Sequence, residues 1–179
     1  ASTDLLTGLL NRQGFMTSIK NLGVDEGTKN VVMYIDLDNF KYYNDTVGHE
    51  IGDLVLVLFA NILQNLANEN GLAIRYGGDE FLLIFKDKNE EYAVDVAKSI
   101  YAQIEDGFAS NIEKRLNKKI EIPEEKRLSC CIGIASFDST SEIAIEAALD
   151  RADEALYSVK NTTKHNYKVW KDESRDEKN

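Results

Sequence analysis

Two short apolar runs joined by a pair of glycines constrain the fold of this chain most strongly. The runs Ala73–Tyr76 and Phe81–Phe85 are separated only by Gly77-Gly78-Asp79-Glu80. Paired glycines between two runs of strand-forming residues predict a β-hairpin, because glycine readily adopts the positive φ angles of a tight turn. Any sheet that contains this hairpin therefore includes an antiparallel pair of strands.

The rest of the chain alternates between helical and strand patterns. The predicted strands are Val31–Leu37, Leu128–Ala135 and Tyr167–Trp170, and the predicted helices are Arg12–Leu22, Asp53–Asn68, Tyr92–Gly107 and one that Ser139-x-x-Glu142 opens as a capping box. A polar turn is expected at residues 25–30. Alternating helices and strands with one hairpin predict a mixed α/β sheet in a single domain, residues 1–170, followed by a polar, frayed tail at 171–179.

Charge and cysteine content narrow the range of partners. The formal net charge of −10 argues against a protein that coats nucleic acid or an anionic membrane. An anionic small ligand would need a divalent cation and nearby lysines to offset this charge.

The adjacent Cys130 and Cys131 would strain a mutual disulfide, so we expect reduced thiols and a cytoplasmic protein. No apolar run is expected to cross a bilayer.

An acidic pair follows the first predicted strand. Residues two apart on a strand share a face, so Asp36 and Asp38 are expected to point the same way. Hard carboxylate oxygens at the end of a strand suit Mg²⁺, whose remaining ligands are waters and substrate phosphates. In the alternative interpretation, Asp38 and Asn39 only end the strand and cap the next helix. This segment alone favours that alternative for Asp38 and leaves Asp36 open.

The glycine turn also has two interpretations. As a bare hairpin, its glycines supply the turn and Asp79 and Glu80 are solvated. A turn without side chains also lets a substrate approach the backbone closely, which would give the two acids a function. The turn by itself does not decide between them.

Five ordered motifs together resemble the GGDEF family of diguanylate cyclases. The signature is intact at Gly77–Phe81, and the resemblance covers about residues 4–164. The other motifs are Asp4-x-Leu6-Thr7-Gly8-Leu9-x-Asn11-Arg12, Asp36-x-Asp38-x-Phe40-Lys41-x-x-Asn44-Asp45 with Gly48-His49-x-x-Gly52-Asp53, Ser129-x-x-Gly133, and Ala152-Asp153-x-Ala155-Leu156-Tyr157-x-x-Lys160.

This resemblance implies a fold and an activity. The fold would be a central, mostly antiparallel five-stranded sheet flanked by helices, like a nucleotidyl cyclase or polymerase palm. The activity would be condensation of two GTP into cyclic di-GMP with release of pyrophosphate, by attack of a ribose 3′-hydroxyl on an α-phosphate. Two Mg²⁺ per active site, or Mn²⁺ in their place, would assist. The family also implies a catalytic homodimer, an upstream sensor or dimerising segment, no nucleic-acid partner, and a cytoplasmic location, either free or as part of a membrane-bound sensor.

The resemblance also assigns roles to individual residues. Asp36, the Leu37 carbonyl and Asp79 would bind metal, and Asp79 would also accept the proton of the attacking hydroxyl. The catalytic set is Asp79, Lys41, which would stabilise phosphate charge, and Glu80, as part of the signature. The substrate-binding set is Asn44, His49, Asp53, Asn39, Phe40, Gly78, Lys160 and Lys164.

Asn44 and Asp53 would read the guanine base in this assignment. A carboxylate pairs with the N1–H and amino group of guanine, and a side-chain amide offers both a donor and an acceptor. In the alternative interpretation, Asp53 is an N-cap of the helix predicted to start there. His49 is expected to be a substrate-loop or structural residue rather than a general base.

Two features depart from the family pattern. Asn68 and Gly71 replace the Arg-x-x-Asp pair of a product-inhibition site, which predicts no feedback through that site. Thr163 replaces a usual glycine before Lys164, so the phosphate role of Lys164 depends on a changed turn. The charged stretch 107–127 is expected to be a solvated insertion.

Two alternatives to the cyclase remain: a catalytically silent GTP-binding regulatory module, and a related palm enzyme with another product.

Overall fold

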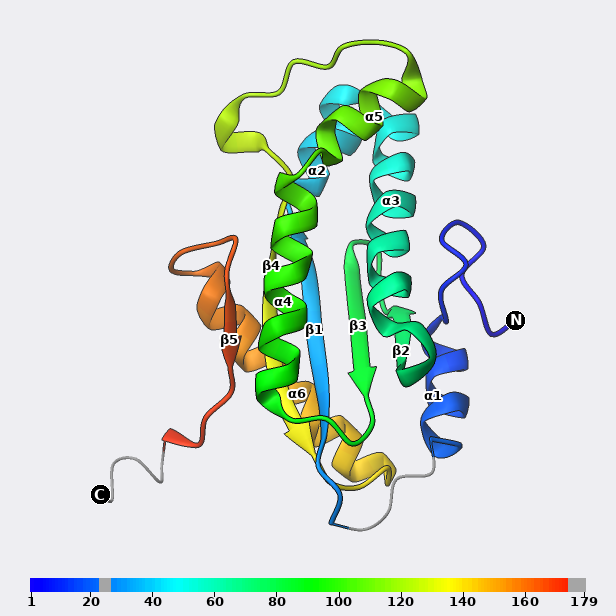
Figure 1. The fold of residues 1–179 in the computed structure, drawn as a ribbon, viewed down its shortest axis with the longest axis vertical. Coiled ribbons are helices and arrows are strands. Elements are labelled where there is room, and N and C mark those ends of the chain that lie inside the picture. Colours follow the sequence, from blue (N-terminus) through cyan, green and yellow to red (C-terminus); the bar gives the residue numbers. More distant parts are fainter. Residues whose placement is uncertain (23–26, 174–179) are drawn as a thin grey trace.

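A five-stranded mixed sheet forms the centre of the computed structural model, which describes residues 1–22 and 27–173 (Figure 1). The strand order is β2-β3-β1-β4-β5. The strands are β1 (Asn30–Asp38), β2 (Gly71–Arg75), β3 (Glu80–Phe85), β4 (Ser129–Phe137) and β5 (Tyr167–Val169). Strand β1 pairs antiparallel with β3 and β4, β2 pairs antiparallel with β3, and β4 pairs parallel with β5. The prediction of a mixed, mostly antiparallel sheet with a β2–β3 hairpin is confirmed.

Helices cover both faces of the sheet. The longer ones are α1 (Arg12–Lys20), α3 (His49–Ala67), α4 (Glu90–Glu105), α5 (Phe108–Leu116) and α6 (Glu142–Lys160); α2 (Phe40–Tyr42) and the π-helical turn η1 (Tyr43–Val47) follow β1. Figure 1 shows α3 and α4 in front of the sheet and α6 behind it.

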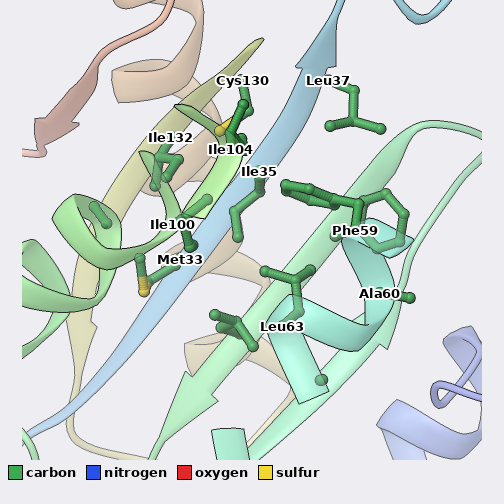
Figure 2. Close-up of a cluster of buried hydrophobic side chains, with 14 of the residues drawn as sticks. Met33, Ile35, Leu37, Phe59, Ala60, Leu63, Ile100, Ile104, Cys130 and Ile132 are labelled. Carbon is green, nitrogen blue, oxygen red and sulfur yellow. The ribbon is translucent and has the colours of Figure 1, made fainter. Parts of the chain in front are cut away.

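Alternation along β1 divides the core into two layers. Met33, Ile35 and Leu37 face α3 and α4, whereas Val32 and Tyr34 face α1 and α6. Figure 2 shows the first layer, where Phe59, Ala60 and Leu63 of α3 and Ile100 and Ile104 of α4 pack over β1 and β4. Successive strand residues point to opposite faces, so the buried, free Cys130 and Cys131 belong to different layers.

Helix α3 begins four residues earlier than the sequence pattern predicted, at His49 rather than Asp53. The pattern was misread at Gly52, which lies inside the helix and not in a loop. A Cβ at Gly52 would lie 2.6 Å from Oδ1 of Asn44, so this glycine permits close packing rather than a turn. The break is instead at Gly48, whose φ of 128° suits glycine.

Two expectations about helices need correction. The N-cap of α6 is Ser141, whose Oγ accepts a hydrogen bond from the Ala144 amide at 3.2 Å, so the predicted capping box at Ser139 is wrong. Contrary to the membrane expectation, the 22-residue stretch His49–Asn70 is apolar enough, at a mean hydropathy of 1.4, to cross a bilayer by length and composition alone. Nine residues of α3 are buried inside the protein, which is how a core helix acquires this apolarity.

The 107–127 stretch is not simply a solvated insertion. It contains α5, whose Phe108 and Ile112 are buried in the same core layer as α3 and α4. The rest of the stretch returns to β4 through a 3₁₀ turn at Glu124–Lys126. Apolar residues at positions 108 and 112 share one helical face, and this signal was hidden by the surrounding charges.

Candidate active site

The end of β1 and the β2–β3 hairpin are joined directly. The Leu37 amide donates a hydrogen bond to the Asp79 carbonyl at 3.1 Å. Asp36 and Glu80 are direct partners in the register between β1 and β3. The two acidic segments that the sequence singled out therefore lie side by side in the structure.

Asp36 is a buried carboxylate with one unsatisfied oxygen. Its side chain is 7% exposed, and its Oδ2 forms an ion pair with the Lys160 ammonium at the end of α6. Its Oδ1 is buried with no hydrogen-bond partner among the described residues. A buried oxygen without a donor is costly, and a cation would satisfy it. Burial lowers the pKa of Lys160, as expected for an ammonium drawn into the protein.

The donor set therefore fits a divalent cation that the substrate helps to hold. Within the described ranges, no three His, Cys, Asp or Glu side chains form a ready-made metal cage. Mg²⁺ is commonly bound by one or two carboxylates together with substrate phosphates. Asp36 and Asp79 on adjacent segments match that pattern better than the closed ligand set of a structural metal.

The two acids of the hairpin titrate above their ordinary range. Burial raises the pKa of Asp79, and the neighbouring Asp38 adds to the shift. Burial also raises the pKa of Glu80, with further contributions from Asp79 and Asp153 and a partly opposing hydrogen bond from Tyr34. Carboxylates that are destabilised as anions gain most when a cation binds beside them. Both acids are partly buried in the structure.

Asp38 shares the face of Asp36, as predicted, but has different partners. Its Oδ2 accepts hydrogen bonds from Ser129 Oγ at 2.9 Å and from the His165 amide at 3.2 Å. Asn39 stands at the N-cap position of α2 but makes no side-chain cap hydrogen bond, and its amide group donates to the Arg127 carbonyl at 2.8 Å. The alternative in which these two residues only cap the next helix is therefore wrong.

An arginine braces the glycine turn. Nε and a terminal nitrogen of Arg75 donate to the Gly78 carbonyl at 3.1 and 2.9 Å, while its other terminal nitrogen contacts both oxygens of Asp4 at 3.2 Å. Arg12 donates from Nε to the Tyr76 carbonyl at 2.7 Å and stacks on the Tyr76 ring. Asp4, Arg12 and Arg75 had no predicted role; the ordered motif at residues 4–12 was the signal that could have revealed one for Asp4 and Arg12.

An open pocket of about 530 Å³ lies over this brace. It is lined by Asp4, Asn11, Arg12, Gln13, Arg75, Tyr76, Gly77 and Gly78. Gly78 is exposed, and a Cβ added there would have nothing within 4 Å. The backbone of the turn is therefore accessible from solvent.

The predicted base-reading residues lie together where η1 meets α3. Asn44 Oδ1 is 2.9 Å from Nδ1 of His49, and it rests against Gly52. Asp53 is exposed one residue further along α3. Because α3 starts at His49, Asp53 is in the second helical turn, and the alternative in which it serves as an N-cap is wrong. Asn44 is part of the π-helical turn η1, and such turns are often found at functional sites.

The other predicted phosphate-binding lysines lie on separate segments. Lys41 is exposed on α2, directly after Phe40, which is partly buried. Lys164 is exposed in the turn between α6 and β5, with a left-handed φ of 43°. Each segment connects to the acidic edge, since α2 follows β1 and the α6 turn follows Lys160.

Comparisons with known proteins give the same picture. The family model for the diguanylate cyclase GGDEF domain matches residues 1–166. The chain is 32% identical over 171 residues to diguanylate cyclase DosC of Escherichia coli (strain K12), covering 94% of this chain and 35% of that protein. It is 32% identical over 166 residues to diguanylate cyclase A of Treponema denticola, covering 89% of this chain and 42% of that protein.

Solved structures agree with the sequence relatives. The GGDEF domain of DgcB from Caulobacter crescentus, in complex with c-di-GMP, superposes with a TM-score of 0.76 at 25% identity, covering 94% of this chain and 95% of that one. The chain spans well under half the length of the two curated relatives. The family model, the relatives and the shared fold together show that this chain belongs to the GGDEF domain family.

Proposed function

We propose that this domain is a diguanylate cyclase, and the observation that carries the proposal is the buried, unsatisfied Oδ1 of Asp36 beside the Asp79 hairpin. In the reaction, the 3′-oxygen of each GTP bonds to the α-phosphorus of the other. The bond from each α-phosphorus to its β-phosphate oxygen breaks, so two pyrophosphates leave and one cyclic di-GMP forms. The relatives named as diguanylate cyclases and the c-di-GMP complex of DgcB support this assignment.

Asp36, Asp79 and the Leu37 carbonyl would hold the magnesium ions, with Mn²⁺ as a substitute. Bound there, the metal would neutralise triphosphate charge and lower the pKa of the attacking hydroxyl. Asp36 offers its free Oδ1, and the Leu37–Asp79 hydrogen bond keeps the two segments together. A network of this kind holds carboxylates in place before the substrate arrives.

Asp79 is the residue proposed to take the proton of the 3′-hydroxyl. A carboxylate beside a hydroxyl that a metal ion activates is placed to accept its proton. Arg75 fixes the turn from the other side through Gly78, which limits the movement of the Asp79 backbone. Glu80 is hydrogen-bonded by Tyr34 and lies opposite Asp36 in the sheet, so its proposed role is to support this arrangement electrostatically.

Lysines would offset the charge of the triphosphate in a protein whose net charge is −10. Lys160 is already at the acidic edge through its ion pair with Asp36. Lys41 and Lys164 are exposed on the two adjoining segments. Backbone at Asn39, Phe40 and Gly78 would complete the phosphate contacts, consistent with the exposure of Gly78.

The guanine base would be read by Asp53 and Asn44. Asp53 is free to accept from N1–H and the amino group of guanine, whereas adenine offers no donor at N1. Asn44 is held in place by His49 and Gly52, so its side-chain amide is oriented in advance. His49 in this arrangement positions Asn44 rather than acting as an acid or base.

A homodimer and a cytoplasmic location complete the proposal. Each domain would hold one GTP, so two domains must meet head to tail before both bonds can form. In the whole protein, a sensor or dimerising segment would bring them together, and GTP is available in the cytoplasm. Turnover by the isolated domain should then rise more steeply than linearly with protein concentration.

Turnover under enforced dimerisation tests the function. The domain is fused to a dimerising coiled coil and incubated with GTP, ATP and Mg²⁺, and nucleotides are identified by mass. Cyclic di-GMP is the expected product, with ATP left unreacted. GTP bound without turnover would contradict the cyclase assignment and favour a silent GTP-binding module. A linear or adenine-containing product would favour a different palm enzyme.

A further inference from the structure

The turn between α6 and β5 has an unfavourable backbone conformation. Lys164 and His165 are consecutive non-glycine residues in the left-handed region, with φ of 43° and 47°. A Cβ makes this region unfavourable for most residues. Such a conformation persists only where neighbouring groups hold it.

The backbone of this turn is held from the end of β1. The His165 amide donates to Oδ2 of Asp38 at 3.2 Å, across 127 residues of sequence. On the far side of the turn, the Ile132 amide donates to the Asn166 carbonyl at 3.0 Å. The Lys164 amide donates to the Val159 carbonyl at 3.2 Å, which ties the turn to the end of α6.

The other partners of Asp38 also belong to the protein. Ser129 Oγ donates to Oδ2 at 2.9 Å, and the Cys131 thiol lies 3.3 Å from both oxygens. Burial, together with the charge of Asp38, raises the pKa of Cys131 to about 12, so the thiol keeps its proton and remains a donor at neutral pH. Both oxygens of Asp38 are thus engaged, unlike the free Oδ1 of Asp36. Asp36 and Asp38, which belong to the same motif, therefore have different partners.

The His165 side chain adds a second hold on the turn from α4. Its ring packs edge-on against Tyr101 at 4.7 Å between centroids, and Nε2 lies 3.5 Å from Glu105 Oε1. Tyr101 in turn donates to the Cys130 carbonyl at 3.3 Å. The side chain of His165 is therefore held by α4, whereas its backbone is held by the Asp38 carboxylate at the end of β1.

We propose that Asp38 is a positioning residue whose carboxylate holds the left-handed Lys164–His165 turn and thereby places Lys164 for the substrate phosphates. The assignment of Lys164 to phosphate rests on the proposed cyclase function, whereas the hold on the turn does not. Hydrogen bonds to an ionised carboxylate are about twice as strong as neutral ones, which suits Asp38 to hold a disfavoured backbone.

Hydrogen exchange of the ligand-free domain tests the hold itself. In Asp38→Ala, amides of residues 161–166 are expected to exchange at least about 10-fold faster, because a charge-assisted hydrogen bond is lost. Ser129→Ala is the matched control: it removes one bond to Asp38 but leaves the His165 contact, so exchange should change little. Asp38→Asn keeps an acceptor oxygen but loses the charge, so its amides should exchange at a rate between those of wild type and Asp38→Ala. Unchanged exchange in Asp38→Ala, or, if that variant does not fold, exchange in Asp38→Asn equal to that of wild type, overturns the proposal.

A double-mutant cycle with Lys164 tests the link to substrate. Asp38→Ala and Lys164→Ala are each expected to raise the GTP concentration for half-maximal rate about 10-fold, with a smaller effect on kcat. If Asp38 acts through Lys164, the double variant is no worse than either single one, whereas independent effects would multiply to about 100-fold. Multiplying effects overturn the proposal. Absence of wild-type turnover would refute the cyclase function, while hydrogen exchange would still decide whether Asp38 holds the turn.

Discussion

The Lys160 ammonium forms an ion pair with Oδ2 of Asp36, and the other oxygen of that carboxylate, Oδ1, has no hydrogen-bond partner in the described part of the chain. A buried carboxylate oxygen without a donor is uncommon in folded proteins, and binding of a cation during function would account for it. The lysine compensates part of the charge in the ligand-free domain. The proposed metal and the triphosphate would compensate the rest.

Removing the lysine should destabilise the domain. Lys160→Met leaves Asp36 buried without its counter-charge, and we expect a loss of about 1–3 kcal/mol in the free energy of unfolding, toward the low end because Lys160 is partly exposed. Urea unfolding at pH 7 measures it. The double variant Asp36→Asn/Lys160→Met should recover most of the loss, since the unpaired charge is gone, and Lys168→Met on the exposed side of β5 serves as control. Equal stability of Lys160→Met and wild type would show that the pair is not a structural contact.

Asp79→Asn should abolish turnover and stabilise the fold. Since burial raises the pKa of Asp79, its ionisation destabilises the folded state, and the contribution of this group to stability falls as pH rises through the raised pKa. The asparagine variant should therefore melt roughly 1–3 °C higher than wild type at pH 7. Below the ordinary aspartate pKa, where both proteins are neutral at this position, the difference should disappear. Thermal melts at several pH values measure this; a destabilised variant at pH 7 would contradict the assignment.

The Arg75–Asp4 pair should link the start of the domain to the glycine turn. Burial raises the pKa of Asp4, but hydrogen bonds from Thr7 and then from Arg75 outweigh burial and lower it overall. Asp4 thus contributes stability that is present above its ordinary pKa and lost as pH falls through its lowered pKa. Asp4→Asn should remove this pH-dependent part of the free energy of unfolding. It should also reduce turnover about 10-fold, because Arg75 loses a partner that holds it in place. Assays of turnover and of unfolding at acid pH test this prediction, and Glu69→Gln, on an exposed turn, is the control. Unchanged turnover would mean that the Arg75–Asp4 pair does not position the hairpin.

Restoring the product-inhibition pair should not restore inhibition. A Cβ at Gly71 would lie 2.7 Å from the Ile84 carbonyl and 2.8 Å from the Phe85 ring, so an aspartate there forces the start of β2 apart. We expect Gly71→Asp to lower stability by about 1–3 kcal/mol, whereas Asn68→Arg, at an exposed position, should cost less. Calorimetry with cyclic di-GMP and urea unfolding measure both effects. Tight product binding by the Asn68→Arg/Gly71→Asp variant at full stability would contradict this account of the missing site.

The sequence predicted the parts of the fold that depend on local pattern. The central position of β1, the β2–β3 hairpin and the mixed sheet are confirmed, because apolar runs and paired glycines specify them locally. The start of α3 was missed since Gly52 serves a contact with Asn44, and a contact across the chain has no local signature. Asp38 was misread for the same reason: its donors at Ser129 and His165 lie 91 and 127 residues away.

The candidate site was predictable in its location but not in its contacts. The family resemblance assigned Asp36 and Asp79 to one metal site, and the structure joins their two segments through the hydrogen bond from the Leu37 amide to the Asp79 carbonyl. The brace from Arg75 and Arg12 could not be derived, because it depends on the N-terminal motif folding back over the hairpin. The functions of the metal, base-reading and phosphate residues remain predictions.

Product analysis of the wild-type domain and its Asp36→Asn variant tests the central claim most directly. Both proteins, dimerised by the same fused coiled coil, are incubated with GTP and Mg²⁺, and cyclic di-GMP and pyrophosphate are quantified. We predict two pyrophosphates for each cyclic di-GMP from the wild type, and at least a 100-fold slower rate from Asp36→Asn. Comparable rates from the two proteins, or GTP binding by the wild type without any cyclic di-GMP, would contradict the account.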